Sequence, residues 1–198
     1  MRVISGIAKG RKLVSFKGSD IRPTSDRAKE SLFNIIKEKI ACSSFLDLFA
    51  GSGAIGIEAL SRGAESMVFV ENRVTSIALI KKNLEKCGFS KSPGQHIKII
   101  HKDVLIYLKT AKKKFDIIFI DPPYQTNLAE KSLFFLSKNN LLKSDGMIIL
   151  EQYFKRATEQ EICGLQCVKR KESITYFFSF LFFIKRKKNK RCRTLLST

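Results

Sequence analysis

The stretch Phe45-Leu-Asp-Leu-Phe-Ala-Gly-Ser-Gly-Ala-Ile-Gly56 indicates the architecture of this chain, because an apolar strand leads directly into a glycine-rich turn. Gly51, Gly53 and Gly56 have the spacing at which a strand turns into a helix beside a bound nucleotide. Further strand-like and helix-like segments alternate after this turn. The alternation predicts an α/β fold: a doubly wound, Rossmann-like, mostly parallel sheet of seven strands.

Periodicity places the elements of this sheet along the chain. We predict strands at residues 45–49, 67–70, 97–100, 115–120 and 147–150, and helices at 54–61, 74–86, 104–110 and 128–137. Two further strand-like stretches, around 165–169 and 174–184, are expected to complete the sheet.

A smaller unit is expected in front of the sheet. Two basic segments, beginning at Arg2 and Lys12, flank a turn between Gly6 and Gly10, which predicts a small basic hairpin. An amphipathic helix should follow, with Thr24, Ser25 or Asp26 as its cap. Its apolar positions recur at helical spacing: Ala28, Leu32, Ile35, Ile36 and Ile40.

The length of 198 residues suits one domain. We expect that domain at residues 1–184, with the hairpin and helix in about 1–40 and the sheet that carries the site in about 44–184. Residues 185–198 are predicted to be a disordered basic tail, because a run of like charges repels itself. Its positive charges are Lys185, Arg186, Lys187, Lys188, Lys190, Arg191 and Arg193.

The whole chain is strongly basic, with 37 Lys and Arg against 18 Asp and Glu, a formal net charge of +19. Such a balance predicts a polyanionic partner, whose phosphates the cations neutralise with release of counterions. Nucleic acid is the leading candidate, and an anionic membrane surface is the alternative. The apolar run at 177–184 is too short to span a bilayer, so we expect no membrane insertion.

The five cysteines are odd in number, scattered and without a Cys-x-x-Cys pair. This pattern favours reduced thiols over a disulfide framework or a structural zinc site. His96 and His101 flank a predicted strand and are expected to be structural. No signal peptide is evident at the N-terminus. We therefore expect a cytoplasmic protein without a metal.

The glycine turn raises two cofactor hypotheses. Its spacing, with Glu71 about twenty residues later, fits a nicotinamide dinucleotide. However, Asp47 would repel a pyrophosphate at this turn, whereas S-adenosylmethionine carries cationic groups and no phosphate. Glu71 can accept ribose hydroxyls, and Asp103 can accept from the adenine amine. The predicted cofactor-binding residues are Asp47, Phe49, Gly51, Ser52, Gly53, Glu71, Asn72, Asp103, Val104 and Asp121.

The stretch Asp121-Pro122-Pro123-Tyr124 follows the apolar segment at 115–120. Prolines cannot continue a ladder, so the chain must leave the sheet there. A carboxylate, a rigid loop with free carbonyls and an aromatic ring are thus expected at the carboxyl end of a central strand, where open α/β sheets bind ligands. These four residues form the predicted catalytic group, suited to a planar base with an exocyclic amine.

The chain resembles class I methyltransferases and, more narrowly, the RsmD family. The resemblance runs from Arg2 to about Tyr176 and depends most on the Arg-Pro-Thr-Ser-Asp-Arg-Ala-Lys-Glu-Ser-Leu-Phe-Asn block at 22–34. It implies S-adenosylmethionine-dependent methylation of a guanine N2 amine in 16S rRNA, on free RNA or the small ribosomal subunit, by a monomer. The Phe-rich stretch at 177–184 and the basic tail depart from the family pattern.

The family block also implies roles for Arg22, Thr24 and Arg27 near the cofactor or the target phosphates. Alternatively, these arginines only pair with acids around the first helix, including Glu30. The hairpin residues Arg2, Lys9, Arg11 and Lys12 are expected to contact phosphates without sequence preference.

Two further hypotheses remain for the function. An adenine-N6 DNA methyltransferase could use the same Asp-Pro-Pro-Tyr stretch, although the chain has little room for a target-recognition segment. A non-catalytic RNA-binding module is disfavoured, because Asp47, Glu71, Asp103 and Asp121 are all present.

Overall fold

The computed structural model describes residues 1–16, 26–91, 94–123, 126–153, 161–162, 164–173 and 178–185. Some predicted features lie outside these residues, namely Arg22, Thr24, Ser25, Tyr124 and the strand-like stretch at 174–177. The predicted tail is described only at Lys185.

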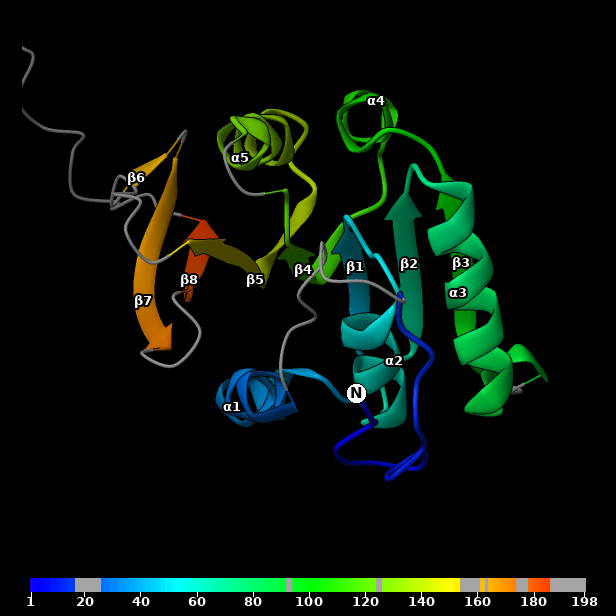
Figure 1. The fold of residues 1–198 in the computed structure, drawn as a ribbon. Coiled ribbons are helices and arrows are strands. Elements are labelled where there is room, and N and C mark those ends of the chain that lie inside the picture. Colours follow the sequence, from blue (N-terminus) through cyan, green and yellow to red (C-terminus); the bar gives the residue numbers. More distant parts are fainter. Residues whose placement is uncertain are drawn as a thin grey trace, which may run out of the picture.

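A sheet of eight strands forms the centre of the described structure, in the order β3-β2-β1-β4-β5-β8-β7-β6 (Figure 1). Strands β3 to β5 pair in parallel, whereas the β5–β8, β8–β7 and β7–β6 pairs are antiparallel. The strands are β1 (Ser44–Leu48), β2 (Ser66–Glu71), β3 (His96–His101), β4 (Phe115–Ile120), β5 (Leu142–Tyr153), β6 (Glu161–Ile162), β7 (Leu165–Ser173) and β8 (Phe178–Lys185).

The predicted doubly wound, mostly parallel α/β fold is confirmed. Seven strands have five or more residues, which matches the predicted number, and the two-residue β6 extends the edge of the sheet. Strand β5 begins five residues before the predicted start at 147, and its register with β4 shifts between Phe115 and Ile117. Because this irregularity interrupts the regular strand pattern, periodicity did not predict the first residues of β5.

Helices cover both faces of the sheet (Figure 1). One face carries α1 (Asp26–Ile36), α2 (Ala54–Ser61) and α3 (Val74–Lys86), and the other carries α4 (Val104–Thr110) and α5 (Leu128–Lys138). The 3-10 turns η1 (Lys37–Lys39) and η2 (Phe89–Lys91) follow α1 and α3.

The central strands are apolar along their length because both of their faces are covered. In β4, Ile117 and Phe119 join the core beneath α1–α3, whereas Ile118 and Ile120 join the core beneath α4 and α5. The prolines after β4 end this buried strand at the edge where the site lies.

The predicted N-terminal hairpin is present in a reduced form. A single antiparallel bridge joins Arg2 to Lys12, and the Val3 amide donates to the Arg11 carbonyl at 3.0 Å. Gly6 has a φ of 85°, and a Cβ there would lie 1.7 Å from the Ser61 carbonyl oxygen. Only glycine therefore fits where the turn presses against the last turn of α2.

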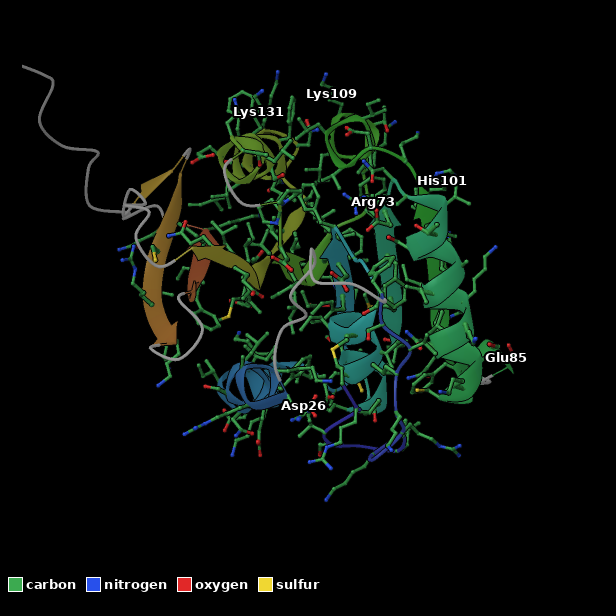
Figure 2. The ribbon with its side chains drawn as sticks, viewed as in Figure 1. Asp26, Arg73, Glu85, His101, Lys109 and Lys131 are labelled. Carbon is green, nitrogen blue, oxygen red and sulfur yellow. The ribbon has the colours of Figure 1, made fainter. Side chains whose placement is uncertain are left out.

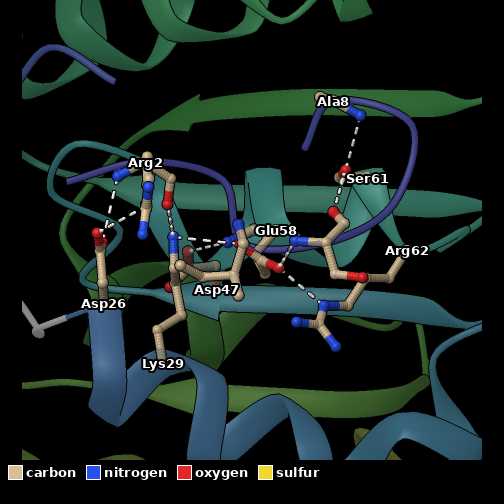
Figure 3. A network of polar contacts seen from close by, with 11 residues as sticks. Arg2, Ala8, Asp26, Lys29, Asp47, Glu58, Ser61 and Arg62 are labelled. Carbon is tan, nitrogen blue, oxygen red and sulfur yellow. Dashed lines mark hydrogen bonds and ion pairs between the residues drawn. The ribbon is translucent and has the colours of Figure 1, made fainter. Parts of the chain in front are cut away.

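Glu58 anchors the N-terminal residues to helix α2, which covers one face of the sheet (Figure 3). Its two carboxylate oxygens accept the amides of Ile4 and Ser5 at 2.8 and 3.0 Å. Lys29 of α1 lies 3.2 Å from the same carboxylate, and both side chains are fully buried. Arg62 adds a second cationic contact at 2.8 Å.

This buried cluster ties three segments together. Lys29 also donates to the Arg2 carbonyl, and the Ser61 hydroxyl donates to the Ser5 carbonyl at 2.6 Å while accepting the Ala8 amide at 2.9 Å. Burial lowers the pKa of Lys29, and the Glu58 carboxylate opposes that effect. Removing either partner would leave a buried, uncompensated charge.

We predict that Glu58→Gln lowers the free energy of unfolding by about 3–5 kcal/mol, because Lys29 loses its buried counter-charge. Urea unfolding followed by circular dichroism measures the change. Glu65→Gln, at an exposed acid just beyond the same helix, is the control. A Glu58→Gln protein as stable as the control would contradict the anchoring role.

Candidate active site

The carboxyl ends of β1, β2 and β4 bring the predicted site residues to one edge of the sheet. The glycine turn follows β1, Glu71 ends β2 and Asp121 follows β4. Arg73 and His101 lie along the same edge, after β2 and at the end of β3 (Figure 2).

The glycine turn has a tight backbone conformation. Gly51 and Gly53 have φ values of 55° and 77°, and Phe49 adopts a φ of 62° although it is not glycine. A non-glycine residue in this region is strained, and such strain clusters at ligand-binding sites. Gly53 donates its amide to the Ala50 carbonyl at 2.8 Å and precedes the first residue of α2.

Gly56 allows α2 to approach β2 closely. A Cβ at this position would lie 2.3 Å from both the Met67 and the Phe69 side chains. The last glycine of the turn sequence therefore has a packing role rather than a ligand-binding one. The close approach fixes where α2 begins relative to the strand ends.

Glu71 is buried and braces the glycine turn. One carboxylate oxygen accepts the Gly51 amide at 2.8 Å, and the other accepts the amides of Asn72 and Arg73, both at 2.9 Å. Two carboxylate oxygens offer about four acceptor positions. These three bonds leave room for a ligand hydroxyl, while Glu71 also holds the loop that would surround it.

Asp47 is also buried, near the end of β1, and accepts the Gly56 amide at 3.2 Å. Burial raises the pKa of Asp47 well above its ordinary value; the Gly56 bond opposes this, and the charges of Asp121 and Glu71 add to it. Asp47 thus points toward the start of α2 and not outward.

Asp121 completes a group of three neighbouring carboxyls. Part of the residue is exposed, and its amide donates to the Leu48 carbonyl of β1 at 3.4 Å. Desolvation by the surrounding protein raises the pKa of Asp121 to about 7. The group can therefore exchange a proton near neutral pH.

The proline loop offers carbonyl acceptors beside Asp121. Pro122 is buried and Pro123 is exposed. The Pro123 carbonyl accepts the Thr126 hydroxyl at 2.8 Å, so one acceptor position of that carbonyl is already used. Tyr124 lies outside the described residues, so its predicted stacking role remains a prediction.

Asp103 caps α4, accepting the Ile106 amide at 3.0 Å, and its side chain is exposed. Val104, the first residue of α4, is buried. Asn72 is exposed, and its carbonyl oxygen lies 3.0 Å from Nε2 of His101. These residues border the site near the ends of β2 and β3.

Asn83 of α3 is a residue that the sequence reasoning missed. It is fully buried; its Oδ1 accepts the Val14 amide at 2.7 Å, and its Nδ2 donates to the carbonyls of Val14 and Ser52, both at 2.9 Å. It therefore joins the N-terminal segment to the glycine turn. The available signal was an amide side chain at a helical position between the buried Ile80 and Leu84.

The predicted phosphate-binding residues gather elsewhere. Arg2, Lys9 and Arg27 line a cavity of about 480 Å³ together with Asp26 and Glu30. This cavity lies where the hairpin meets α1, and the hairpin packs on the last turn of α2. The glycine turn precedes the first turn of that eight-residue helix, about 12 Å away along its axis.

Acids accompany the basic residues of this cavity. Arg2, which was predicted to contact phosphate, lies 3.5 Å from Asp26. Arg11 and Lys12 are exposed on the same hairpin. The structure thus brings part of the basic set together at the hairpin and α1, and Asn83 connects the second hairpin segment, at Val14, to the glycine turn.

Within the described ranges, no three His, Cys, Asp or Glu side chains are arranged to bind a metal ion. None of the helices in the described part of the chain combines the length and the apolar character needed to cross a bilayer.

The chain is similar to known proteins both in sequence and in fold. A family model described as "Conserved hypothetical protein 95" matches residues 1–181. Ribosomal RNA small subunit methyltransferase D of Haemophilus influenzae is 40% identical over 153 residues, covering 76% of this chain and 78% of that protein. Putative rRNA methyltransferase YlbH of Bacillus subtilis is 39% identical over 176 residues, covering 87% and 93%.

Solved structures show the same fold. Putative methyltransferase yhhF from Escherichia coli has a TM-score of 0.82 and 28% identity, covering 95% of this chain and 99% of that one. A putative methyltransferase named SMU.776, solved in complex with SAH, has a TM-score of 0.61 and 17% identity, covering 85% and 52%, and shows likeness of fold alone.

We predict that Asn83→Ala weakens binding of S-adenosylmethionine, the cofactor expected from the sequence, about tenfold, because the Ser52 carbonyl in the glycine turn loses its buried donor, a loss of roughly 1.4 kcal/mol. Isothermal titration calorimetry measures the affinity. Glu85→Ala, at an exposed position on the same helix, is the control. Equal affinities for the two variants would show that Asn83 does not support the turn.

We also predict a pH-dependent effect of Asp121→Asn on stability. Because the folded pKa of about 7 exceeds the ordinary value of 3.8, the carboxyl favours folding below pH 4 and loses that contribution as pH rises through 7. Asparagine cannot ionise. The variant should therefore melt a few degrees above the wild type at pH 8 and close to it at pH 4.5. A pH-independent difference in melting temperature would refute this.

Proposed function

Because this chain belongs to the conserved hypothetical protein 95 family, which its sequence motifs identify as the RsmD family, we propose that it is an S-adenosylmethionine-dependent methyltransferase of small-subunit ribosomal RNA. The observation that carries the proposal is the group of carboxyls, Asp47, Glu71 and Asp121, around the glycine turn. The names of the curated relatives support RNA as the substrate.

The carboxyl group favours S-adenosylmethionine over a dinucleotide. Burial and mutual repulsion raise the pKa of Asp47, so the site is crowded with negative charge when its carboxyls ionise. A pyrophosphate would increase that repulsion, whereas the sulfonium and ammonium of the donor would relieve it. The charge of the site therefore favours S-adenosylmethionine over a nicotinamide dinucleotide as the cofactor.

The remaining contacts of the donor follow from the positions of the predicted residues. The free acceptor position of Glu71 suits a ribose hydroxyl, and Asp103 with Val104 borders the place for the adenine. Phe49, Gly51 and Ser52 supply the turn that approaches the donor closely. Asn83 supports that turn from behind through the Ser52 carbonyl.

The acceptor amine is assigned by resemblance to N2 of a guanine, whose lone pair is delocalised into the ring. Asp121 and the Pro122 carbonyl accept its two N–H groups and aim the lone pair at the donor methyl. The Pro123 carbonyl suits this role less well, because it already accepts the Thr126 hydroxyl. Tyr124 stacks on the base, which must leave its own stack to enter the pocket.

In the transfer step, the nitrogen lone pair forms a bond to the methyl carbon while the carbon–sulfur bond breaks. The bonding pair stays on sulfur, and the donor leaves as S-adenosylhomocysteine. The nitrogen then releases one proton to Asp121 or to water. A carboxyl with a pKa of about 7 is suited to receive that proton at neutral pH. Alignment and stabilisation of the developing charge supply the acceleration.

A tritium-transfer assay on unmethylated small subunits, naked 16S rRNA and DNA tests the substrate class. We expect label in the small subunits or the rRNA, and mapping should place it on a guanine N2. Label in DNA would support the adenine-N6 alternative, and no label in any substrate would support the RNA-binding module.

We predict that Asp121→Ala lowers the transfer rate at least a hundredfold, because the amine loses the acceptor that orients it, while donor affinity stays within about threefold of the wild type. Glu71→Ala should instead weaken donor binding, because both the ribose contact and the Gly51 bond are lost. Single-turnover transfer and calorimetry separate the two effects. Near-normal turnover by Asp121→Ala would remove Asp121 from the mechanism.

A further inference from the structure

A cluster of lysines lies at the end of the sheet where the parallel strands begin, opposite the active site. We call this region the basic edge. The parallel strands begin on this side, and β8, which runs antiparallel to β5, ends there. The lysines come from η1, β3, the loop before β4, the start of β5 and the end of β8. They are Lys39, Lys98, Lys113, Lys114, Lys143 and Lys185.

Polar partners hold several of these ammonium groups in place. Lys113 donates to the Ser66 hydroxyl at 3.0 Å and lies 5.4 Å from the centre of the Phe115 ring. Lys185 donates to the side chain of Asn140 at 2.6 Å. Because Ser66, Phe115 and Asn140 carry no charge, these contacts orient the lysines without neutralising them.

The lysines are close enough to repel one another. Burial and then the charges of Lys98 and Lys143 lower the pKa of Lys113. Burial and then the charge of Lys114 lower the pKa of Lys185. A polyanion bound across these groups would relieve the repulsion.

Acids offset only part of this charge. Asp116 lies 2.7 Å from Lys143; burial alone would raise its pKa, but bonds from Lys143 and Ser44 bring it below the ordinary value. Glu65 lies close enough to Lys113 to oppose the lowering of its pKa. Lys39 reaches the main-chain carbonyl of a third acid, Asp145, at 3.0 Å. Six lysines thus face three acids, and the edge keeps a net positive charge.

Six further positive charges follow Lys185 in the sequence, beginning at Arg186 and Lys187.

Strand length separates the basic edge from the chemistry. The six residues of β4 span about 20 Å between the loop that carries Lys113 and the Asp121 loop. A nucleotide that occupies the active site does not reach so far. An anion at the basic edge must belong to another part of the substrate or to another molecule.

We propose that the basic edge binds the phosphate backbone of a second segment of the folded RNA substrate, distinct from the segment that presents the target base. The proposal rests on the proposed function for its choice of RNA. Point charges fixed along the edge of a rigid sheet suit a backbone contact that positions the substrate without reading its sequence. Affinity then depends on the fold of the RNA as well as on the target base.

The test neutralises two exposed lysines of this edge, Lys98→Gln with Lys114→Gln, in the full chain. The control, Lys81→Gln with Lys86→Gln, removes the same charge from exposed positions on α3. Binding to naked 16S rRNA is measured over a range of salt concentrations. The basic-edge variant should reduce the slope of log affinity against log salt by about 1–2, because each lost phosphate contact removes roughly 0.7–0.9. The control should change the slope by less than half of that.

A second comparison uses an RNA of three nucleotides, which even when extended is too short to span the distance of about 20 Å from the active site to the basic edge. The basic-edge variant should bind this RNA as the wild type does. Equal slopes for both variants on 16S rRNA would overturn the proposal, as would an equal loss on the short RNA. Loss of binding to phosphatidylserine vesicles, with RNA binding unchanged, would assign the edge to a membrane and also overturn it.

Donor binding by calorimetry shows that each variant is folded, and methyl transfer is recorded separately for the wild type. Transfer to rRNA together with an unchanged salt slope would refute the basic edge and leave the proposed function intact. A reduced salt slope without any methyl transfer by the wild type would support phosphate binding at the basic edge and refute the proposed function.

Discussion

The reversal of strand order between β1 and β4 is the constraint on which the site depends. From β1 the chain proceeds through α2 to β2 and β3 on one side, and it then crosses to β4 on the other side of β1. The loops after β1 and β4 consequently diverge, and open sheets bind ligands in the crevice that forms at such a point. The glycine turn follows β1 and Asp121 follows β4, and the Asp121 amide donates a hydrogen bond to the Leu48 carbonyl at 3.4 Å.

Charge is distributed unevenly around that crevice. Asp47, Glu71 and Asp121 gather at the carboxyl edge of a chain whose net charge is +19. Lysines and arginines collect instead around the hairpin, α1 and the opposite edge of the sheet. An acidic pocket within a basic exterior fits a small cationic donor and a large anionic acceptor, each attracted to a different region of one small domain.

Local patterns predicted most of the fold, since the bounds of α2, α3, α4 and β4 match those expected from periodicity. The same patterns did not reveal contacts between distant segments. The sequence reasoning assigned no role to Glu58, which binds the N-terminal residues and Lys29. Asp47, a predicted cofactor-binding residue, accepts the Gly56 amide, a contact that the sequence reasoning did not reveal. Such pairings depend on how layers pack, which spacing along the chain does not specify.

The most direct test of the account is the number of protons exchanged when the donor binds. Calorimetry at pH 7 in buffers of different ionisation enthalpy measures this number. Desolvation raises the pKa of Asp121 to about 7, so its carboxyl can exchange a proton at this pH. The approach of a sulfonium should lower that pKa, so a substantial fraction of a proton should be released, and less for S-adenosylhomocysteine, which lacks the sulfonium charge. Equal exchange for the two ligands, or none for either, would contradict the claim that these carboxyls select a cationic donor.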